Sequence, residues 1–118
     1  METTATKINA ILDAISKGIE KRESMAAEAM KTLDNLCTTP EEYKKANLHF
    51  GINSYVANYL KRIQAVVMER DLKKAENAIR FHHFQQLKIG AIDDGGDVSL
   101  AQAIVANILG DYIESFFS

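Results

Sequence analysis

The chain has 118 residues, of which 47% are apolar and 25% are charged, and its formal net charge is −2. With one Pro, six Gly and one Cys, the composition is typical of a single globular domain and excludes collagen-like, low-complexity and disulfide-stapled chains. Charged residues interrupt every long apolar run and the chain opens on Met-Glu-Thr-Thr, so we expect one soluble, cytoplasmic domain over residues 1–118 that makes no use of a membrane.

The first predicted element is an amphipathic helix over about residues 3–38. On its polar face, Asp13 and Lys17 have the spacing that favours an ion pair. Arg22 falls inside the apolar stripe, where it either extends to solvent, pairs with a carboxylate across the bundle, forms a buried pair that fixes the register, or contacts a ligand. The apolar positions share one stripe of the helix, at Ile8, Ile11, Leu12, Ile15, Ile19, Ala26, Ala29, Met30, Leu33, Leu36 and Cys37.

A second helical stretch is predicted over residues 40–89. The run Thr39–Glu42 begins it, because this run offers a threonine N-cap, a proline at the first helical position and a glutamate that can complete a capping box. The phase of the apolar positions changes at Gly51 and again near Asp71, so we expect a bend or a change of packing partner at each point. Asp71 is also a suitable cap for a fresh helix.

Residues 90–97 are predicted to form a loop because Gly and Asp cluster there, and residues 99–116 form a last, very apolar helix. No segment alternates as a half-buried strand does, so the predicted fold class is all-α, an antiparallel bundle of long helices. Such helices are longer than a compact chain of this size allows, so either the second stretch folds back on itself or the molecule is elongated. We favour an elongated molecule completed by a two-fold homodimer. The apolar chain end is the expected dimer interface, with Tyr112, Phe116 and Phe117.

No pattern in the chain indicates catalysis, a metal or a cofactor, so we expect a protein that is not an enzyme. His82 and His83 are adjacent, and neighbouring side chains on a helix point about 100° apart, so the two cannot chelate one metal ion. The carboxylates of Asp93–Asp97 lack the order of a calcium loop and its final glutamate. The single Cys37 has no histidine near it in the sequence that would indicate a nucleophile.

Charge is distributed unevenly: residues 61–92 carry seven basic and three acidic groups, whereas residues 93–118 carry five acidic groups and no basic ones. The two segments either neutralise each other or leave the basic one facing an anionic partner. Within the basic segment, Phe81 and Phe84 lie opposite the apolar line of their helix and among cations. Either both faces of this helix are buried in the bundle or in a dimer, or the two rings form an exposed surface, whose composition is typical of a binding site.

These observations predict a non-enzymatic helical interaction module, of the adaptor, chaperone or inhibitor type, that binds another protein and forms a homodimer. The expected partner-binding residues are Lys73, Arg80, Phe81, Phe84 and Lys88. A first alternative is nucleic-acid binding by the basic, aromatic-interleaved segment 61–88. A second alternative is a small-ligand-binding bundle with a cavity surrounded by Arg22, Tyr55, Tyr59 and His82.

Overall fold

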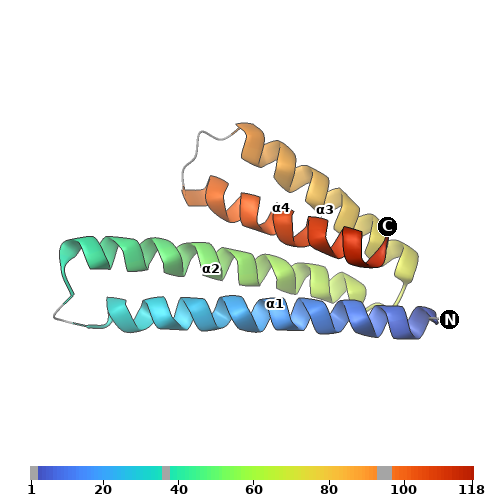
Figure 1. Ribbon diagram of the computed structural model, residues 1–118, viewed down its shortest axis with the longest axis horizontal. Helices are drawn as coiled ribbons and strands as arrows, with labels where there is room; N and C mark the ends of the chain where they lie inside the picture. Colours follow the sequence, from blue (N-terminus) through green and yellow to red (C-terminus); the bar gives the residue numbers. More distant parts are fainter. Residues whose placement is uncertain (1–2, 36–37, 93–96) are drawn as a thin grey trace.

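A computed structural model of the chain describes residues 3–35, 38–92 and 97–118 and consists of four α-helices, α1 (Thr4–Leu33), α2 (Pro40–Val67), α3 (Leu72–Ile92) and α4 (Asp97–Phe116). Helices α1 and α2 form a long antiparallel hairpin, and α3 and α4 form a shorter one that lies on α2 (Figure 1). The described residues contain no strand. The predicted all-α, antiparallel architecture is therefore confirmed.

The helix starts follow the local capping signals. The Thr39 hydroxyl accepts a hydrogen bond from the backbone N–H of Glu42 at 3.2 Å, with Pro40 at the first position of α2, as predicted. Asp71 accepts one from the backbone N–H of Lys74 at 3.1 Å at the start of α3. Each bond satisfies a backbone donor that the first helical turn leaves unpaired, so these residues fix where α2 and α3 begin.

The helix ends agree less closely with the sequence. Helix α1 ends at Leu33 rather than near residue 38, because the chain leaves the helix at Asp34 and the Thr38 hydroxyl donates back to the Thr32 carbonyl at 2.8 Å. Helix α3 continues to Ile92, so residues 90–92, which were expected in a loop, are helical. Residues 93–96, which include most of the acidic loop, lie outside the described residues, as do residues 36 and 37.

The two changes of apolar phase have different outcomes. Helix α2 continues through Gly51 without a break, and α4 covers only the part of α2 that is farther from the hairpin tip (Figure 1). Near Asp71 the chain reverses direction completely. Arg70 has φ 63°, in the left-handed region, and its guanidinium donates to Asn9 at 3.1 Å, which ties the turn to α1.

The hydrophobic core lies where both hairpins meet. Each buried aliphatic side chain there contributes about 1.5–3 kcal/mol relative to exposure in the unfolded chain. Helix α4 approaches α1 closely at Gly18, where an added Cβ would lie 3.0 Å from the Tyr112 hydroxyl and 3.2 Å from Leu60 Cδ1. The largest fully buried side chains are Ile8, Ile11, Ile15, Leu60, Ile63, Ile79, Leu109, Val56, Val67 and Val105.

The molecule is elongated, as predicted. Its radius of gyration is 16.2 Å and its extents are 55 × 29 × 19 Å, whereas a compact chain of about this length would have a radius of gyration near 13 Å. The reason is that the shorter hairpin covers only part of the longer one, so the tip of α1–α2 extends past the start of α4 (Figure 1).

Candidate protein-binding surface

The inner side of α3 is held by hydrogen bonds to two different helices. His82 Nδ1 lies 2.6 Å from the Tyr59 hydroxyl of α2, and Gln86 donates to the same hydroxyl at 3.1 Å. His83 Nδ1 lies 2.8 Å from the Ala106 carbonyl of α4. The adjacent histidines thus point to separate neighbours, and together these bonds fix the rotation of α3 about its own axis.

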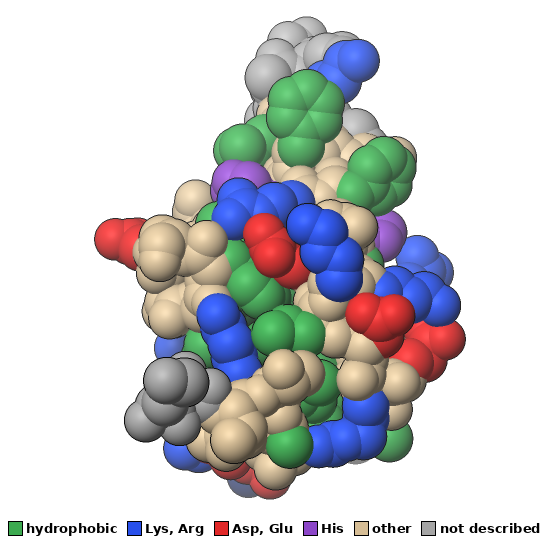
Figure 2. Space-filling model, turned by 90° about the vertical axis from the view of Figure 1, so that its right-hand side faces the viewer, with side chains coloured by type: hydrophobic (Ala, Val, Ile, Leu, Met, Phe, Trp, Pro, Cys, Tyr) green, Lys and Arg blue, Asp and Glu red, His purple; other side chains and the backbone are tan. Residues whose placement is uncertain are grey.

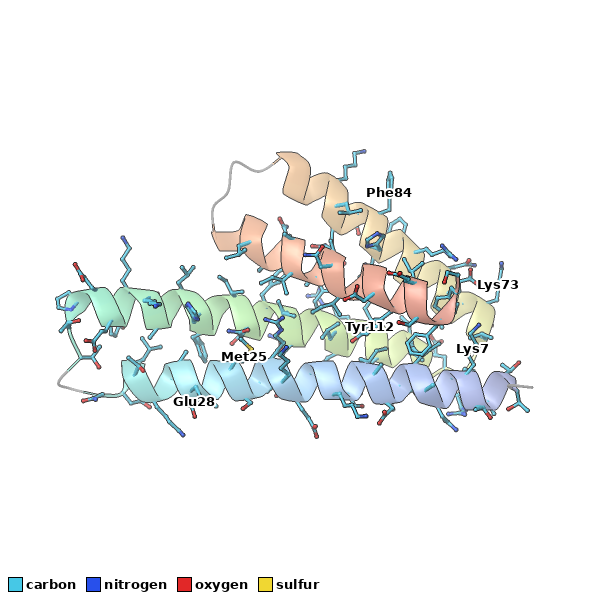
Figure 3. The ribbon with its side chains drawn as sticks, in the orientation of Figure 1. Lys7, Met25, Glu28, Lys73, Phe84 and Tyr112 are labelled. Atoms are coloured by element: carbon cyan, nitrogen blue, oxygen red, sulfur yellow. The ribbon has the colours of Figure 1, made fainter. Side chains whose placement is uncertain are left out.

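This rotation leaves three apolar side chains of α3 in solvent. The exposed fractions of Phe81, Phe84 and Leu87 are 61%, 66% and 49%, and we call these residues the outer ridge of α3. Figure 2 shows hydrophobic side chains standing out at the upper edge of the molecule, with Lys and Arg side chains below them. Phe84 points away from all other helices (Figure 3). If a free Phe side chain offers about 200 Å², each ring leaves about 120 Å² in water.

The cations predicted to bind a partner together with the outer ridge differ in whether they are paired within the chain. Lys73 and Lys88 are exposed, and no ion pair of theirs is found among the described residues. Arg80 instead binds within the chain: its Nε lies 2.9 Å from Glu76 Oε2, and its Nη2 donates to the Phe117 carbonyl at 2.9 Å. Arg80 therefore joins α3 to the end of α4, and a role in partner binding stays a prediction.

Other cations of the basic segment are also paired. Lys61 lies 3.3 Å from Glu23 of α1, and Lys74 lies 2.8 Å from Glu69. Helix α4, which contains the acidic tail, lies beside α3. Among the described residues, however, the acidic partners of these cations come from α1 and from the basic segment itself. Neutralisation of the basic segment is thus partial and local.

The residues predicted for a dimer interface contact this chain's own helices. Tyr112 is buried between α4 and α1, its hydroxyl donates to the Ala14 carbonyl at 3.4 Å, and burial raises its pKa to about 12 (Figure 3). Phe116 and Phe117 are half-buried, and the Lys7 ammonium lies 5.4 Å from the centre of the Phe117 ring. Contact of these three residues with a second chain stays a prediction.

The four residues proposed for a ligand cavity do not come together. Tyr55, Tyr59 and His82 share a hydrogen-bonded cluster with Gln86 between α2 and α3. Arg22 donates instead to Asn53 at 3.1 Å, in the interface of α1 and α2. Burial, followed by the charge of Arg62, lowers the pKa of His82. The hydroxyls of Tyr55 and Tyr59 and the side-chain amide of Gln86 are all hydrogen-bonded within the cluster.

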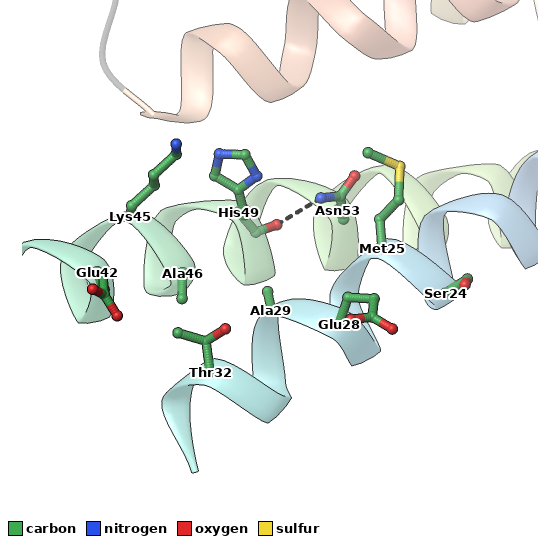
Figure 4. A pocket seen from close by; sticks show the side chains of 10 residues that line it. All are labelled: Ser24, Met25, Glu28, Ala29, Thr32, Glu42, Lys45, Ala46, His49 and Asn53. Atoms are coloured by element: carbon green, nitrogen blue, oxygen red, sulfur yellow. Dashed lines mark hydrogen bonds between the residues drawn. The ribbon is translucent and has the colours of Figure 1, made fainter. Parts of the chain in front are cut away.

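A groove lies nearer the tip of the long hairpin, with a volume of about 560 Å³ (Figure 4). Asn53, one of its lining residues, is buried and donates to the His49 carbonyl at 2.8 Å. Sequence reasoning did not single out Asn53, although its position within the apolar register of α2 is a signal for a buried polar group. The groove is lined by Ser24, Met25, Glu28, Ala29, Thr32, Glu42, Lys45, Ala46, His49 and Asn53.

Leu87 is the member of the outer ridge that sequence reasoning missed. It continues the spacing of Phe81 and Phe84 by one further step of three residues, and that spacing was the available signal. In the described part of the chain, no three His, Cys, Asp or Glu side chains cluster as a metal ion would require. No helix there is long and apolar enough to cross a membrane.

Comparison of the chain with protein-family models, with curated proteins and with solved structures finds no match.

Proposed function

We propose that this protein is a non-enzymatic interaction module that binds another protein through the outer ridge of α3. The observation that supports the proposal is the exposure of Phe81, Phe84 and Leu87 on a helix whose rotation is fixed from its inner side. A rigid helix that presents two aromatic rings and a leucine costs little entropy on binding, because the surface is already ordered.

The energies involved are sufficient for specific binding. Removing about 120 Å² of apolar surface from water is worth about 3 kcal/mol for each phenylalanine at about 25 cal/mol per Å². Part of this gain is lost to the cost of association, so each ring should contribute at the level of an interface hot spot, about 1–3 kcal/mol. Lys73 and Lys88 at the two ends of the ridge favour an acidic partner surface.

The test compares capture of proteins from an extract of the source organism by the wild-type chain and by the double variant Phe81→Ala, Phe84→Ala. We expect proteins retained by the wild type to be lost from the variant, because both rings leave the surface. Tyr43→Ala is the matched control, since Tyr43 is 53% exposed but lies at the hairpin tip. Circular dichroism establishes that both variants are folded, and equal capture by a folded double variant would refute the proposal.

The same experiment separates protein from nucleic-acid binding by the segment 61–88. Pairing of Lys61, Lys74 and Arg80 within the chain lowers the charge available for phosphates. Binding through the aromatic rings should therefore survive nuclease treatment and change little with salt. A nucleic-acid complex would disappear with nuclease and would weaken steeply as salt rises.

A further inference from the structure

Phe84 and Leu87 of the outer ridge belong to a larger exposed surface to which α4 also contributes. The inner side of α4 contains Ala106, which faces His83, and the buried Leu109 and Tyr112. The residues that remain exposed on α4 recur every three or four positions, on the side of the helix opposite its buried residues. With the α3 residues on the same side they form what we call the outer face of the α3–α4 hairpin, made up of Lys73, Phe84, Leu87, Leu100, Asn107, Asp111 and Glu114.

We propose that the partner of this face is a second copy of the chain, which docks its own outer face through a two-fold axis parallel to the helices. The inference rests on the proposed function and names the partner of the same surface. Such an axis places α3 of each copy on α4 of the other, so the two hairpins together form a four-helix bundle. The long hairpins α1–α2 lie on the far sides, behind α3–α4, and do not obstruct the contact (Figure 1).

Charge complementarity supports a second copy as the partner. On α3, Lys73 and Lys88 are exposed cations with no ion pair among the described residues, whereas Lys74 and Arg80 are paired within the chain. From residue 100 onward the chain has two acidic residues, Asp111 and Glu114, and no Lys or Arg. Stacking α3 of one copy on α4 of the other therefore brings opposite charges together in both halves of a symmetric contact. The alternative stacking, α3 on α3, would bring like charges together.

The register within one chain determines which residues would meet. His83 bonds to the Ala106 carbonyl and Arg80 to the Phe117 carbonyl, so the start of α3 lies level with the end of α4. Rotation about a two-fold axis parallel to the helices does not shift residues along that axis. Lys73 of one copy therefore comes near Glu114 of the second copy. At the other end, Leu87 comes near Leu100 of the second copy, which covers apolar surface that is now exposed.

The footprint of the outer face can be compared with that of a stable dimer. On α3 the face extends over 15 residues, from Lys73 to Leu87. At about 1.5 Å per residue and about 10 Å between helix axes, the face measures about 22 by 20 Å, or about 450 Å² before the surface of projecting side chains is added. Standard interfaces bury about 800 Å² per partner. The groove at the hairpin tip extends over nine residues of α1, from Ser24 to Thr32, and twelve of α2, from Glu42 to Asn53, and gives a smaller footprint.

The first measurement is the mass of the full chain in solution by light scattering over a concentration series. A dimer of twice 13.1 kDa that dissociates on dilution is the expected result. Phe84→Ala should raise the dissociation constant at least about tenfold. Tyr43→Ala, the control at the hairpin tip, should leave it unchanged. A monomer at every concentration, or a dimer indifferent to Phe84→Ala, would overturn the inference.

A charge-exchange experiment tests the symmetry of the contact. Lys73→Glu and Glu114→Lys should each weaken the homodimer about tenfold, because each places two pairs of like charges across the interface. Mixing the two variants should restore a dimer of wild-type affinity, since both contacts then join opposite charges. Lys44→Glu, an exposed site on α2, is the matched control and should behave as wild type. Failure of the mixture to recover would exclude the parallel two-fold arrangement.

The outcomes for the two proposals are distinguishable. A chain that stays monomeric but loses captured proteins on Phe81→Ala, Phe84→Ala overturns the second copy as partner and leaves protein binding by the outer ridge in place. An acidic helix of a different protein would then be the occupant. A monomeric chain whose capture is unaffected by the double variant overturns both.

Discussion

Substitution by alanine is expected to have opposite effects on stability at Gly51 and at Gly18. Both lie inside helices, where Gly is less favourable than Ala by about 1 kcal/mol. A Cβ at Gly51 meets no atom within 4 Å and the residue is exposed, so Gly51→Ala should stabilise the protein by about 0.5–1 kcal/mol. With an unfolding entropy of about 2.1 cal/mol/K per residue, this gain corresponds to a rise in Tm of about 2–4 °C.

Gly18→Ala has the same gain in helix propensity but no space for the added atom. Its Cβ would lie 3.0 Å from the Tyr112 hydroxyl and 3.2 Å from Leu60 Cδ1, both in the core. Overpacking of this kind costs about 1–3 kcal/mol, so the net effect should be a loss of up to about 2 kcal/mol. In the Tyr112→Phe background the nearest atom is gone, and Gly18→Ala should cost less than in the wild type.

Both variants are assayed by thermal and urea unfolding, followed by far-UV circular dichroism at one fixed protein concentration. Equal stabilisation by the two substitutions would refute the close approach of α4 to α1 at Gly18. Destabilisation by Gly51→Ala would refute the continuity of α2 through that position, because only a bent or strained backbone there would disfavour alanine.

Three further predictions concern buried or capping polar groups. Burial lowers the pKa of His82 below its ordinary value of 6.5, so the unfolded chain binds this proton more tightly; stability should be complete above about pH 6.5 and decline as the pH falls below it. The urea midpoint measured from about pH 7.5 to about pH 5.5 should show this slope, and His82→Gln should flatten it. Asp71→Ala removes the acceptor for the Lys74 N–H and should cost about 1 kcal/mol in urea unfolding, whereas no loss would mean that the cap is dispensable. Asn53→Ala removes the acceptor of Arg22 and should cost about 1–3 kcal/mol, and an unchanged urea midpoint would show that Arg22 finds solvent instead.

The sequence predicted those features that depend on neighbouring residues. The cap at Thr39 and the cap at Asp71 each follow from signals within a few positions. The position of Phe81 and Phe84 opposite the apolar line of their helix follows in the same way, whereas the sequence left open whether the two rings are exposed or covered. The fold class follows from apolar periodicity for the same reason, since each helix displays its own buried stripe.

Features that depend on contacts across the chain were not predictable in this way. The turn before α3 has Arg70 rather than Gly in the left-handed region, and the contact that accompanies it comes from Asn9, far away in sequence. The sequence alone does not distinguish whether Tyr112 packs against a second chain or in the core of its own. Its contacts with Gly18 and Ala14, which are distant in sequence, place it in the core. The outer face of the α3–α4 hairpin likewise requires the register between two helices, which no single segment encodes.

The extension of the α1–α2 hairpin past α4 has a consequence for amide hydrogen exchange. At the end of the hairpin near the core, each helix is covered by several neighbours, whereas at the tip α1 and α2 have mainly each other (Figure 1). Opening the last turns of the hairpin therefore breaks few apolar contacts, and opening the base requires the whole protein to unfold. Protection of the backbone amides should fall gradually along both helices toward the tip. Within a single helix, amides near the tip would then report local opening, and amides near the base would report global unfolding.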